Sequence, residues 1–166
     1  MTPVTPYPGE VVVGEGRVAR RLRRRVGQAA ARVTRGLRVS YNPRTDGKPD
    51  PGEVVWAWVP YEEDAGRGKD RPVLVIARDR KNLYGLMLTS QDHDRDAAQE
   101  AHWGRYWLDI GSGGWDREGR PSEVRLDRLI RLAPDDVRRE GAALDRPRFD
   151  RVVGAASRHL DLERPR

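Results

Sequence analysis

The chain has 166 residues, of which 37% are hydrophobic and 35% are charged, and 32 Lys and Arg against 26 Asp and Glu give a formal net charge of +6. This composition supports one packed domain with an appendage and a densely ionic surface, and it disfavours a carrier of hydrophobic ligands. The absence of Cys excludes disulfides, thiol nucleophiles and thiolate zinc sites, and with three His we expect neither a metal site nor a cofactor. The longest apolar run, Val54 to Val59, is too short to cross a bilayer, so we expect a cytoplasmic protein without a membrane span or secretory signal.

The basic residues gather near the N-terminus. Residues 1–50 carry 11 Lys and Arg against 4 Asp and Glu, and no acidic residue lies between Glu15 and Asp46. Apolar residues recur there every three or four positions from Val18 to Leu37, which is compatible with a helix that has a narrow apolar stripe and a broad cationic face. A solvated or partly disordered arm is the simpler interpretation. In either form this arm attracts phosphate, so contact with DNA or RNA is expected.

A Pro- and Gly-rich stretch from Tyr41 to Gly52 is interpreted as a stiff linker, and residues 51–166 as the folded domain. The first strand is expected at residues 53–59, where both alternating faces are apolar as in a strand closed into a barrel. A polar loop leads to a second strand at residues 71–78, with Pro72 at its start and β-branched residues after it.

Further strands and one short helix are expected between residues 83 and 132. A third strand is expected at residues 83–90, a short helical piece at residues 97–102 within a charged loop, and a fourth strand at residues 105–111. A Gly-rich loop then precedes one or two strands within residues 122–132.

The C-terminal part changes its hydrophobic period from that of strands to that of helices. Pro134 is expected at the start of one helix that stops at Gly141, and Asp145 is expected to cap a second helix whose apolar face runs from Phe149 to Leu160. The whole pattern predicts a mainly β domain with a C-terminal helix, a small and strongly curved barrel.

Four sequence segments, in this order and spacing, resemble the PemK/MazF toxin family. They are GEVVWAWV at Gly52, the pair Arg71-Pro72 that opens the second strand, Thr89 at the end of the third strand, and SEVRLDRLIRL from Ser122 to Leu132. The resemblance covers Gly52 to about Leu160. It implies an SH3-like barrel, a homodimer, a cognate antitoxin protein as partner, and a type II toxin that cleaves single-stranded RNA without a metal.

The resemblance also assigns candidate catalytic residues. Arg71 matches the catalytic arginine of the family and Thr89 its catalytic hydroxyl residue, and the loop from Tyr61 to Asp70 matches the segment that closes over RNA. A guanidinium stabilises the extra charge of a phosphorane, and a hydroxyl can hydrogen-bond a phosphate oxygen or orient the 2′-hydroxyl. His93 is a candidate third catalytic residue because its pKa suits general acid or base work.

Each of these assignments has a structural alternative. Arg71 could form a surface ion pair with Asp70 or Glu63, Thr89 could bond the backbone at a strand end, and His93 could be a solvated side chain. The alternating Asp92, Asp94 and Asp96 lack the Gly and Glu of a calcium loop, so an EF-hand is rejected.

Further residues are expected to bind nucleic acid. Loop cations and polar groups near the catalytic pair can hold the phosphate backbone, and loop tryptophans among arginines can stack bases. The candidates are Arg67, Lys69, Ser90, Gln91, Trp103 and Trp115. Two other functions stay open at this point, a noncatalytic barrel that binds DNA or RNA and a barrel that binds a peptide.

Overall fold

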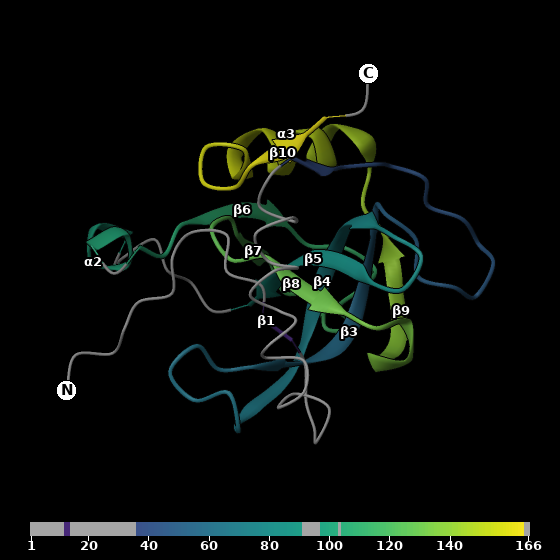
Figure 1. Ribbon diagram of the computed structural model, residues 1–166, viewed down its shortest axis with the longest axis horizontal. Coiled ribbons are helices and arrows are strands. Elements are labelled where there is room, and N and C mark those ends of the chain that lie inside the picture. The colour runs from purple at the N-terminus through teal and green to yellow at the C-terminus, as the bar shows by residue number, and fades with distance from the viewer. Residues whose placement is uncertain (1–11, 14–35, 91–96, 103, 165–166) are drawn as a thin grey trace.

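The computed structural model describes residues 12–13, 36–90, 97–102 and 104–164. It shows a curved sheet with one helix packed across it (Figure 1). The strands are β1 Val12–Val13, β2 Leu37–Arg38, β3 Glu53–Pro60, β4 Gly68–Arg78, β5 Leu83–Thr89, β6 Trp107–Gly111, β7 Ser122–Arg125, β8 Ile130–Leu132, β9 Val137–Ala143 and β10 Leu162–Glu163. The helices are α2 Ala97–His102, the 3-10 turn η2 Pro134–Asp136 and α3 Arg146–Ala156. The prediction of a mainly β domain with a C-terminal helix is confirmed.

The central strands form an antiparallel meander in the middle of the sheet. The strand order is β1-β8-β5-β4-β3-β9, and β6 and β7 form a side ladder that joins the sheet because β7 also pairs with β5. The sheet ends at β1 on one edge and at β9 on the other, so it curves strongly without closing. The expectation of a strand closed into a barrel is corrected in this respect, because no ladder joins β1 to β9.

Both faces of β3 are apolar, as its sequence predicted. Val54 packs into one cluster of buried residues and Val55 into another, on opposite faces of the strand. The first cluster continues under α3, and the second lies on the other face of the sheet, where Val73 and Met87 belong to it. Alternate residues of the central strands therefore build two separate cores.

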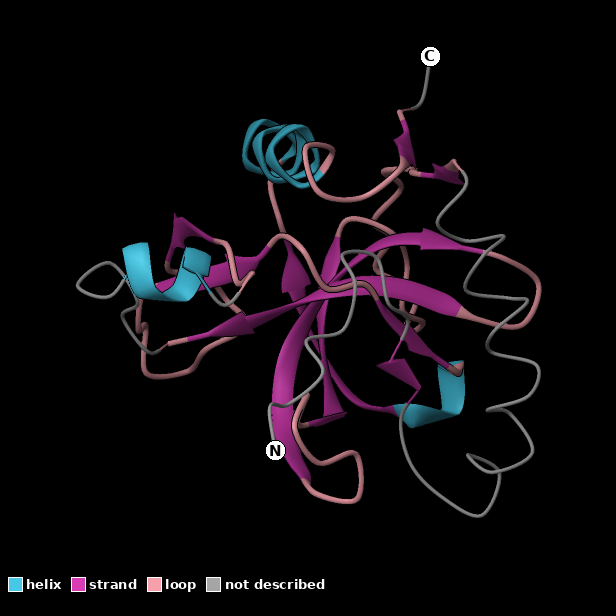
Figure 2. Cartoon of the chain, turned by 60° about the vertical axis from the view of Figure 1, so that its left-hand side comes forward, coloured by secondary structure: helices cyan, strands magenta, loops and turns pink. Residues whose placement is uncertain are grey.

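Helix α3 covers the first face of the sheet (Figure 2). Asp145 caps it by accepting a hydrogen bond from the backbone N–H of Arg148 at 3.1 Å, as the sequence predicted. The buried residues of its apolar face are Phe149, Val152, Val153 and Ala156. None of the helices in the described ranges has the length and apolar character needed to cross a membrane.

The helix expected from Pro134 to Gly141 is wrong. Only the turn η2 forms, and residues 137–143 become strand β9, which pairs with β3. A Cβ at Gly141 would lie 2.4 Å from the Val54 carbonyl oxygen and 3.0 Å from the Trp115 Cβ. Gly141 therefore permits a close approach of β9 to β3 rather than ending a helix.

The stretch interpreted as a linker packs against the sheet. Val39 is buried in the first cluster, the Ser40 N–H donates to the Ile76 carbonyl at 3.0 Å, and the Tyr41 hydroxyl donates to the Leu144 carbonyl at 2.7 Å. In addition, β2 pairs with β10 after α3. Long-range contacts therefore hold Tyr41 and Gly52, at the two ends of this stretch, against the folded domain. The basic pattern from Val18 to Arg35 lies outside the described residues.

Candidate active site

A pocket of about 280 Å³ opens at the end of β4 and β5 where β5 leaves β4 and pairs with β7. This volume is just below the range of about 300 to 1,000 Å³ that is usual for small-molecule sites. The lining residues come from the end of β3, the β3–β4 connection, β4, β5, α2, the start of β6, the end of β7 and the β7–β8 turn. They are Pro60, Tyr61, Glu62, Glu63, Arg71, Met87, Thr89, Glu100, Arg105, Trp107, Arg125 and Arg128.

Arg71 and Thr89 both line this pocket. The antiparallel register pairs Val73 with Met87, and two more residues along each strand lead to Arg71 and to Thr89. Because side chains alternate along a strand, both residues project on the same face as Val73 and Met87. The tertiary structure thus brings together the two residues that the resemblance singled out.

The Arg71 guanidinium is half-buried in the pocket wall. Burial lowers its pKa, and electrostatic interaction with Tyr61 and Glu63 nearby acts in the opposite direction. Thr89 is 7% exposed, so its hydroxyl belongs to the inner end of the pocket rather than to the open surface.

Of the two alternative ion-pair partners expected for Arg71, Asp70 binds another residue. The Asp70 carboxylate forms an ion pair with Arg138 at 3.3 Å. Across the described ranges, Arg71 forms no ion pair within 4 Å. An arginine that lines a pocket without such an ion pair can bind an anion without first breaking a salt bridge.

Two further cations extend from the pocket along β4 and its preceding loop. The pKa of Lys69 is lowered, first by repulsion from Arg71 and second by burial. Lys69 and Arg67 are both exposed. The row of like charges favours a bound polyanion, which would relieve the repulsion between Lys69 and Arg71.

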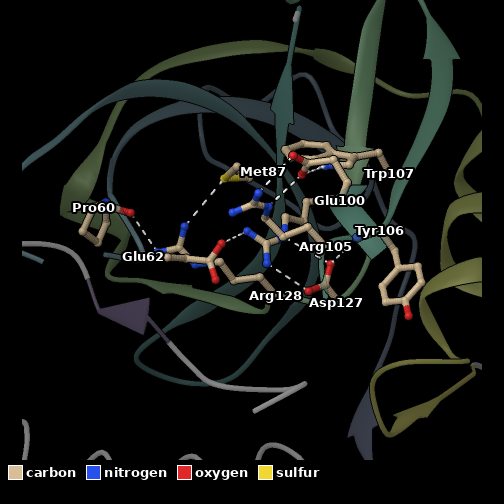
Figure 3. Close-up of polar contacts among 10 residues, drawn as sticks. Pro60, Glu62, Met87, Glu100, Arg105, Tyr106, Trp107, Asp127 and Arg128 are labelled. Carbon is tan, nitrogen blue, oxygen red and sulfur yellow. Dashed lines mark hydrogen bonds and ion pairs between the residues drawn. The ribbon is translucent and has the colours of Figure 1, made fainter. Parts of the chain in front are cut away.

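Helix α2 contributes the carboxylate of Glu100 to the pocket lining (Figure 3). Glu100 accepts hydrogen bonds from the Arg105 Nε at 2.7 Å and the Arg105 Nη2 at 3.0 Å, and from the Trp107 Nε1 at 3.1 Å. The bidentate pair neutralises Arg105 and fixes the indole of Trp107. Trp107 also packs against the second core cluster, so it forms a rigid aromatic part of the wall.

Two arginines of the β7–β8 region tie the β3–β4 connection to the pocket (Figure 3). Arg125 contacts Glu62 and is bound on its other side by Asp127, with Nε to Oδ1 at 3.1 Å and Nη2 to Oδ2 at 2.9 Å. Arg128 donates from Nη2 to the Pro60 carbonyl at 2.8 Å. These bonds hold the start of the loop that leads to Arg71.

Trp115 does not serve the predicted role. It is 2% exposed, its Nε1 donates to the Ser122 Oγ at 3.0 Å, and its carbonyl accepts from the Trp56 Nε1 at 2.8 Å. A Cβ at Gly113 would lie 2.1 Å from the Trp115 ring, so this glycine lets the indole fold over its own loop into the core. The prediction of an exposed base-stacking Trp115 is wrong because burial of the indole is favoured over exposure.

The other predicted site residues have different outcomes. Ser90 is exposed directly after Thr89 and does not line the pocket. His93, Gln91 and Trp103 lie outside the described residues. Among the residues with described positions, no group of three or more His, Asp and Glu is placed to hold a metal ion.

Several residues that line the pocket were not identified as site residues from the sequence. They are Glu62, Glu100, Trp107, Arg125 and Arg128. A partial signal was present, because Arg125 and Asp127 alternate on one side of the chain and their charges are opposite. The residues that meet them, however, come from segments more than 20 positions away.

Comparison with known proteins agrees with the resemblance. Residues 50–160 match the model of the family described as PemK-like, MazF-like toxin of type II toxin-antitoxin system. No curated protein sequence matches the chain. Among solved structures, the Mycobacterium tuberculosis toxin MazF-mt6 is similar with 18% sequence identity, coverage of 67% of this chain and 98% of that chain, and a TM-score of 0.44. The family match spans well over half of the chain, which therefore belongs to the PemK-like, MazF-like toxin family of type II toxin-antitoxin systems.

Proposed function

We propose that this toxin is an endoribonuclease that cleaves single-stranded RNA by attack of a 2′-hydroxyl on the adjacent phosphodiester, without a metal or cofactor. The observation that carries the proposal is that Arg71 and Thr89 line one open pocket from neighbouring strands. Membership of the toxin family supports the class of function, and the pocket supports the choice of residues.

The reaction breaks one bond for each bond that it forms. The 2′-oxygen bonds to phosphorus and loses its proton, and the bond from phosphorus to the 5′-oxygen breaks as that oxygen gains a proton. The products are a 2′,3′-cyclic phosphate and a 5′-hydroxyl. Negative charge accumulates on the nonbridging oxygens in the transition state, so the largest gain comes from donors fixed around them.

Arg71 is assigned to this charge. Its planar fork presents paired donors to phosphate oxygens, and its partial burial strengthens the interaction because water screens it less. Thr89 is assigned to a hydrogen bond with a nonbridging oxygen or with the 2′-hydroxyl, which it would orient for attack. His93 is retained as a candidate for proton transfer.

The cations beside the pocket are assigned to the RNA backbone. Lys69 and Arg67 continue from Arg71 on exposed positions, so a strand that places its scissile phosphate at Arg71 would meet them next. We retain Ser90, Gln91 and Trp103 as candidates for contacts with the RNA. The basic arm at residues 1–50 would add sequence-independent attraction for RNA or DNA.

The biological partner is a cognate antitoxin protein, and the toxin acts in the cytoplasm as a homodimer. An acidic antitoxin segment would inhibit by occupying the phosphate sites at Arg71 and Lys69.

The test uses the purified full chain and a long single-stranded RNA in the presence of EDTA. Wild type is expected to cleave at defined positions, and Arg71→Ala should cleave about a hundredfold to a thousandfold more slowly. Arg138→Ala is the matched control, because it removes an exposed arginine of the neighbouring surface that does not line the pocket.

Cleavage that requires added metal, or that survives Arg71→Ala undiminished, contradicts the proposal. Salt-sensitive RNA binding without any strand scission supports a noncatalytic binding protein instead. Expression of wild type beside Arg71→Ala in cells, with growth and transcript integrity as readouts, tests the toxin role.

A further inference from the structure

An exposed aromatic ring lies outside the pocket, next to its lining residues in the chain. Tyr106 is 38% exposed and is the only large hydrophobic residue in the described ranges that is exposed. It stands between Arg105 and Trp107, which both line the pocket. Figure 3 shows that the Tyr106 ring points away from Arg105 and Trp107. This direction agrees with the alternation of side chains in an extended chain, which places Tyr106 on the other side of the backbone from the pocket.

The Tyr106 ring is fixed before any ligand binds. It stacks on the imidazole of His159, with a centroid distance of 4.2 Å and an angle of 25° between the planes. Its backbone N–H donates to the Asp127 Oδ1 at 2.9 Å, and its carbonyl accepts from the Leu126 N–H at 2.9 Å. His159 covers one face of the ring, so the exposed surface belongs to the edge and the other face. A ring that is already fixed loses little entropy when a second planar group stacks on it.

Arginines accompany this aromatic pair. Arg151 and Arg158 are both exposed, and their spacing of seven residues places them on one face of α3 and the turn that continues it. Arg151 reaches β6, because its Nη2 donates to the Asp109 carbonyl at 2.5 Å. In the described part of the chain, Arg158 forms no ion pair within 4 Å. We call Tyr106, His159, Arg151 and Arg158 together the Tyr106 surface.

The Tyr106 surface can be reached from the pocket around an edge of the sheet. Within the described ranges β6 pairs with β7 alone, so β6 is an edge strand. A polynucleotide that leaves the pocket beside Arg105 and Trp107 can therefore pass around the start of β6 without crossing the sheet. Asp109 and Asp161 are also exposed in this region. The ring is therefore expected to supply most of the affinity, and the arginines to orient the phosphate.

The basic N-terminal stretch joins the folded domain beside this surface. The Leu37 N–H donates to the Asp161 carbonyl at 3.0 Å, two residues after His159. The sequence before Leu37 is rich in arginine and has no acidic residue back to Glu15. A cationic stretch attached at this point favours the approach of a polyanion to the Tyr106 surface.

We propose that Tyr106 stacks an unpaired base of the RNA strand beyond the pocket, with His159 as the backing ring and Arg158 as the partner of the adjoining phosphate. The identity of the ligand rests on the proposed function. Every base has a π-face, so this contact would tolerate any base and would add affinity without sequence selection. Paired bases have no free face in the middle of a duplex, so the contact requires a single strand.

The test places a fluorescent base along an RNA that cannot be cleaved. A single-stranded 2′-fluoro RNA carries 2-aminopurine at one position in each member of a series, and it is bound to the full chain. Stacking on Tyr106 should quench the fluorescence at one position of the series. Tyr106→Leu keeps an apolar side chain without a π-face, so it should remove this quenching and weaken binding about fivefold to tenfold.

Tyr106→Trp is the matched control for the ring. It keeps a stacking surface and should retain both the quenching and the affinity, whereas a merely structural role of Tyr106 would not restore a quenched position. The same RNA annealed to its complement should bind equally to wild type and Tyr106→Leu. Quenching that is absent at every position in wild type, or that survives in Tyr106→Leu, contradicts the proposal.

Arg158 is tested by the salt dependence of binding. Arg158→Met should reduce the slope of log K against log salt by about 0.7, because one phosphate contact is lost. Arg80→Met removes an exposed arginine from the turn after β4 and should leave the slope unchanged. Equal slopes for the two variants contradict the phosphate contact. Thermal unfolding verifies that each variant folds, and if Tyr106→Leu does not fold, the wild-type quenching series and the two salt slopes still decide.

These outcomes are separable from those for the ribonuclease. Position-specific quenching that depends on Tyr106, with a wild type that does not cleave RNA, supports the stacking site and contradicts the ribonuclease. Cleavage by wild type together with equal affinities for wild type and Tyr106→Leu contradicts the stacking site alone.

Discussion

Arg71 and Thr89 lie at the same end of two neighbouring antiparallel strands and line the same pocket. The last pair of the ladder between β4 and β5 is Val73 with Met87, and each of these residues is two positions from Arg71 or Thr89 on its own strand. Each side chain therefore depends on the same ladder for its position, while one supplies a cation and the other a hydroxyl. This arrangement allows the contribution of the hydroxyl to be tested separately from that of the charge.

The first prediction concerns the Thr89 hydroxyl. Thr89→Val keeps the shape of the side chain and removes the hydrogen bond, so RNA cleavage should slow by about a hundredfold. Thr89→Ser retains the hydroxyl and should stay within about tenfold of wild type. Cleavage is measured by single-turnover kinetics, and thermal unfolding verifies that both variants fold. Equal rates for Thr89→Val and wild type would remove Thr89 from the mechanism.

A second prediction concerns the cation next to Arg71 on β4. Lys69→Met should weaken RNA binding and reduce the slope of log K against log salt by about 0.7, because one phosphate contact is lost. The single-turnover rate at saturating RNA should change little, since Lys69 is not assigned to the reacting phosphate. Lys81→Met, which removes an exposed cation from the turn after β4, is the control and should leave the slope unchanged. Identical slopes for the two variants would contradict an RNA path along Lys69.

The third prediction separates the two tryptophans of the β6–β7 region. Trp115→Ala should lower the free energy of unfolding by about 3 to 5 kcal/mol, because it empties a fully buried position and leaves the Ser122 hydroxyl without its donor. Trp115→Phe should cost less and leave RNA affinity unchanged. Trp107→Ala, in contrast, should weaken RNA affinity because Trp107 lines the pocket. Denaturant unfolding and anisotropy measure the two effects, and lower RNA affinity in folded Trp115→Phe would contradict this division.

A fourth prediction follows from the hydrogen bond between the buried Tyr84 and Asp79 at the turn between β4 and β5. Burial, and then the hydrogen bond and charge of Asp79, raise the pKa of Tyr84 to about 12 from its ordinary value near 10. The Tyr84 hydroxyl donates to the Asp79 Oδ2 at 2.6 Å, and this donation requires the protonated phenol. The folded state thus holds the phenolic proton more tightly than the unfolded state.

The sign of the pH dependence follows from this difference. The contribution of the pair is fully present below pH 10 and is lost as the pH rises from 10 to 12, by about 2 to 3 kcal/mol in total. Tyr84→Phe should be less stable than wild type at pH 8, and the gap should narrow toward pH 12. Denaturant unfolding across this range measures the gap, and a constant gap would contradict the linkage.

Much of the fold was predictable because its signals are local. The alternation in residues 53–59, the helix α2 at residues 97–102, and Asp145 as the cap of α3 each depend on neighbours within a few positions. The helix predicted at residues 134–141 does not form, because its signals are also local and a long-range contact opposes them. Pro134 and Gly141 are typical helix boundaries, but the pairing of residues 137–143 with β3 outweighed this local preference.

Sequence by itself determined the positions of strands β3 to β6, the two apolar faces of β3, the capped C-terminal helix, and the motif residues Arg71 and Thr89. Tertiary structure alone decided that Trp115 is buried, that Val39 and Tyr41 pack on the folded domain, and that Arg125 meets both Glu62 and Asp127. The physical reason is the distance along the chain over which each interaction acts. Local preferences act over a few bonds and leave a pattern in the chain, whereas burial and ion pairing depend on which distant segments the folded sheet brings into contact.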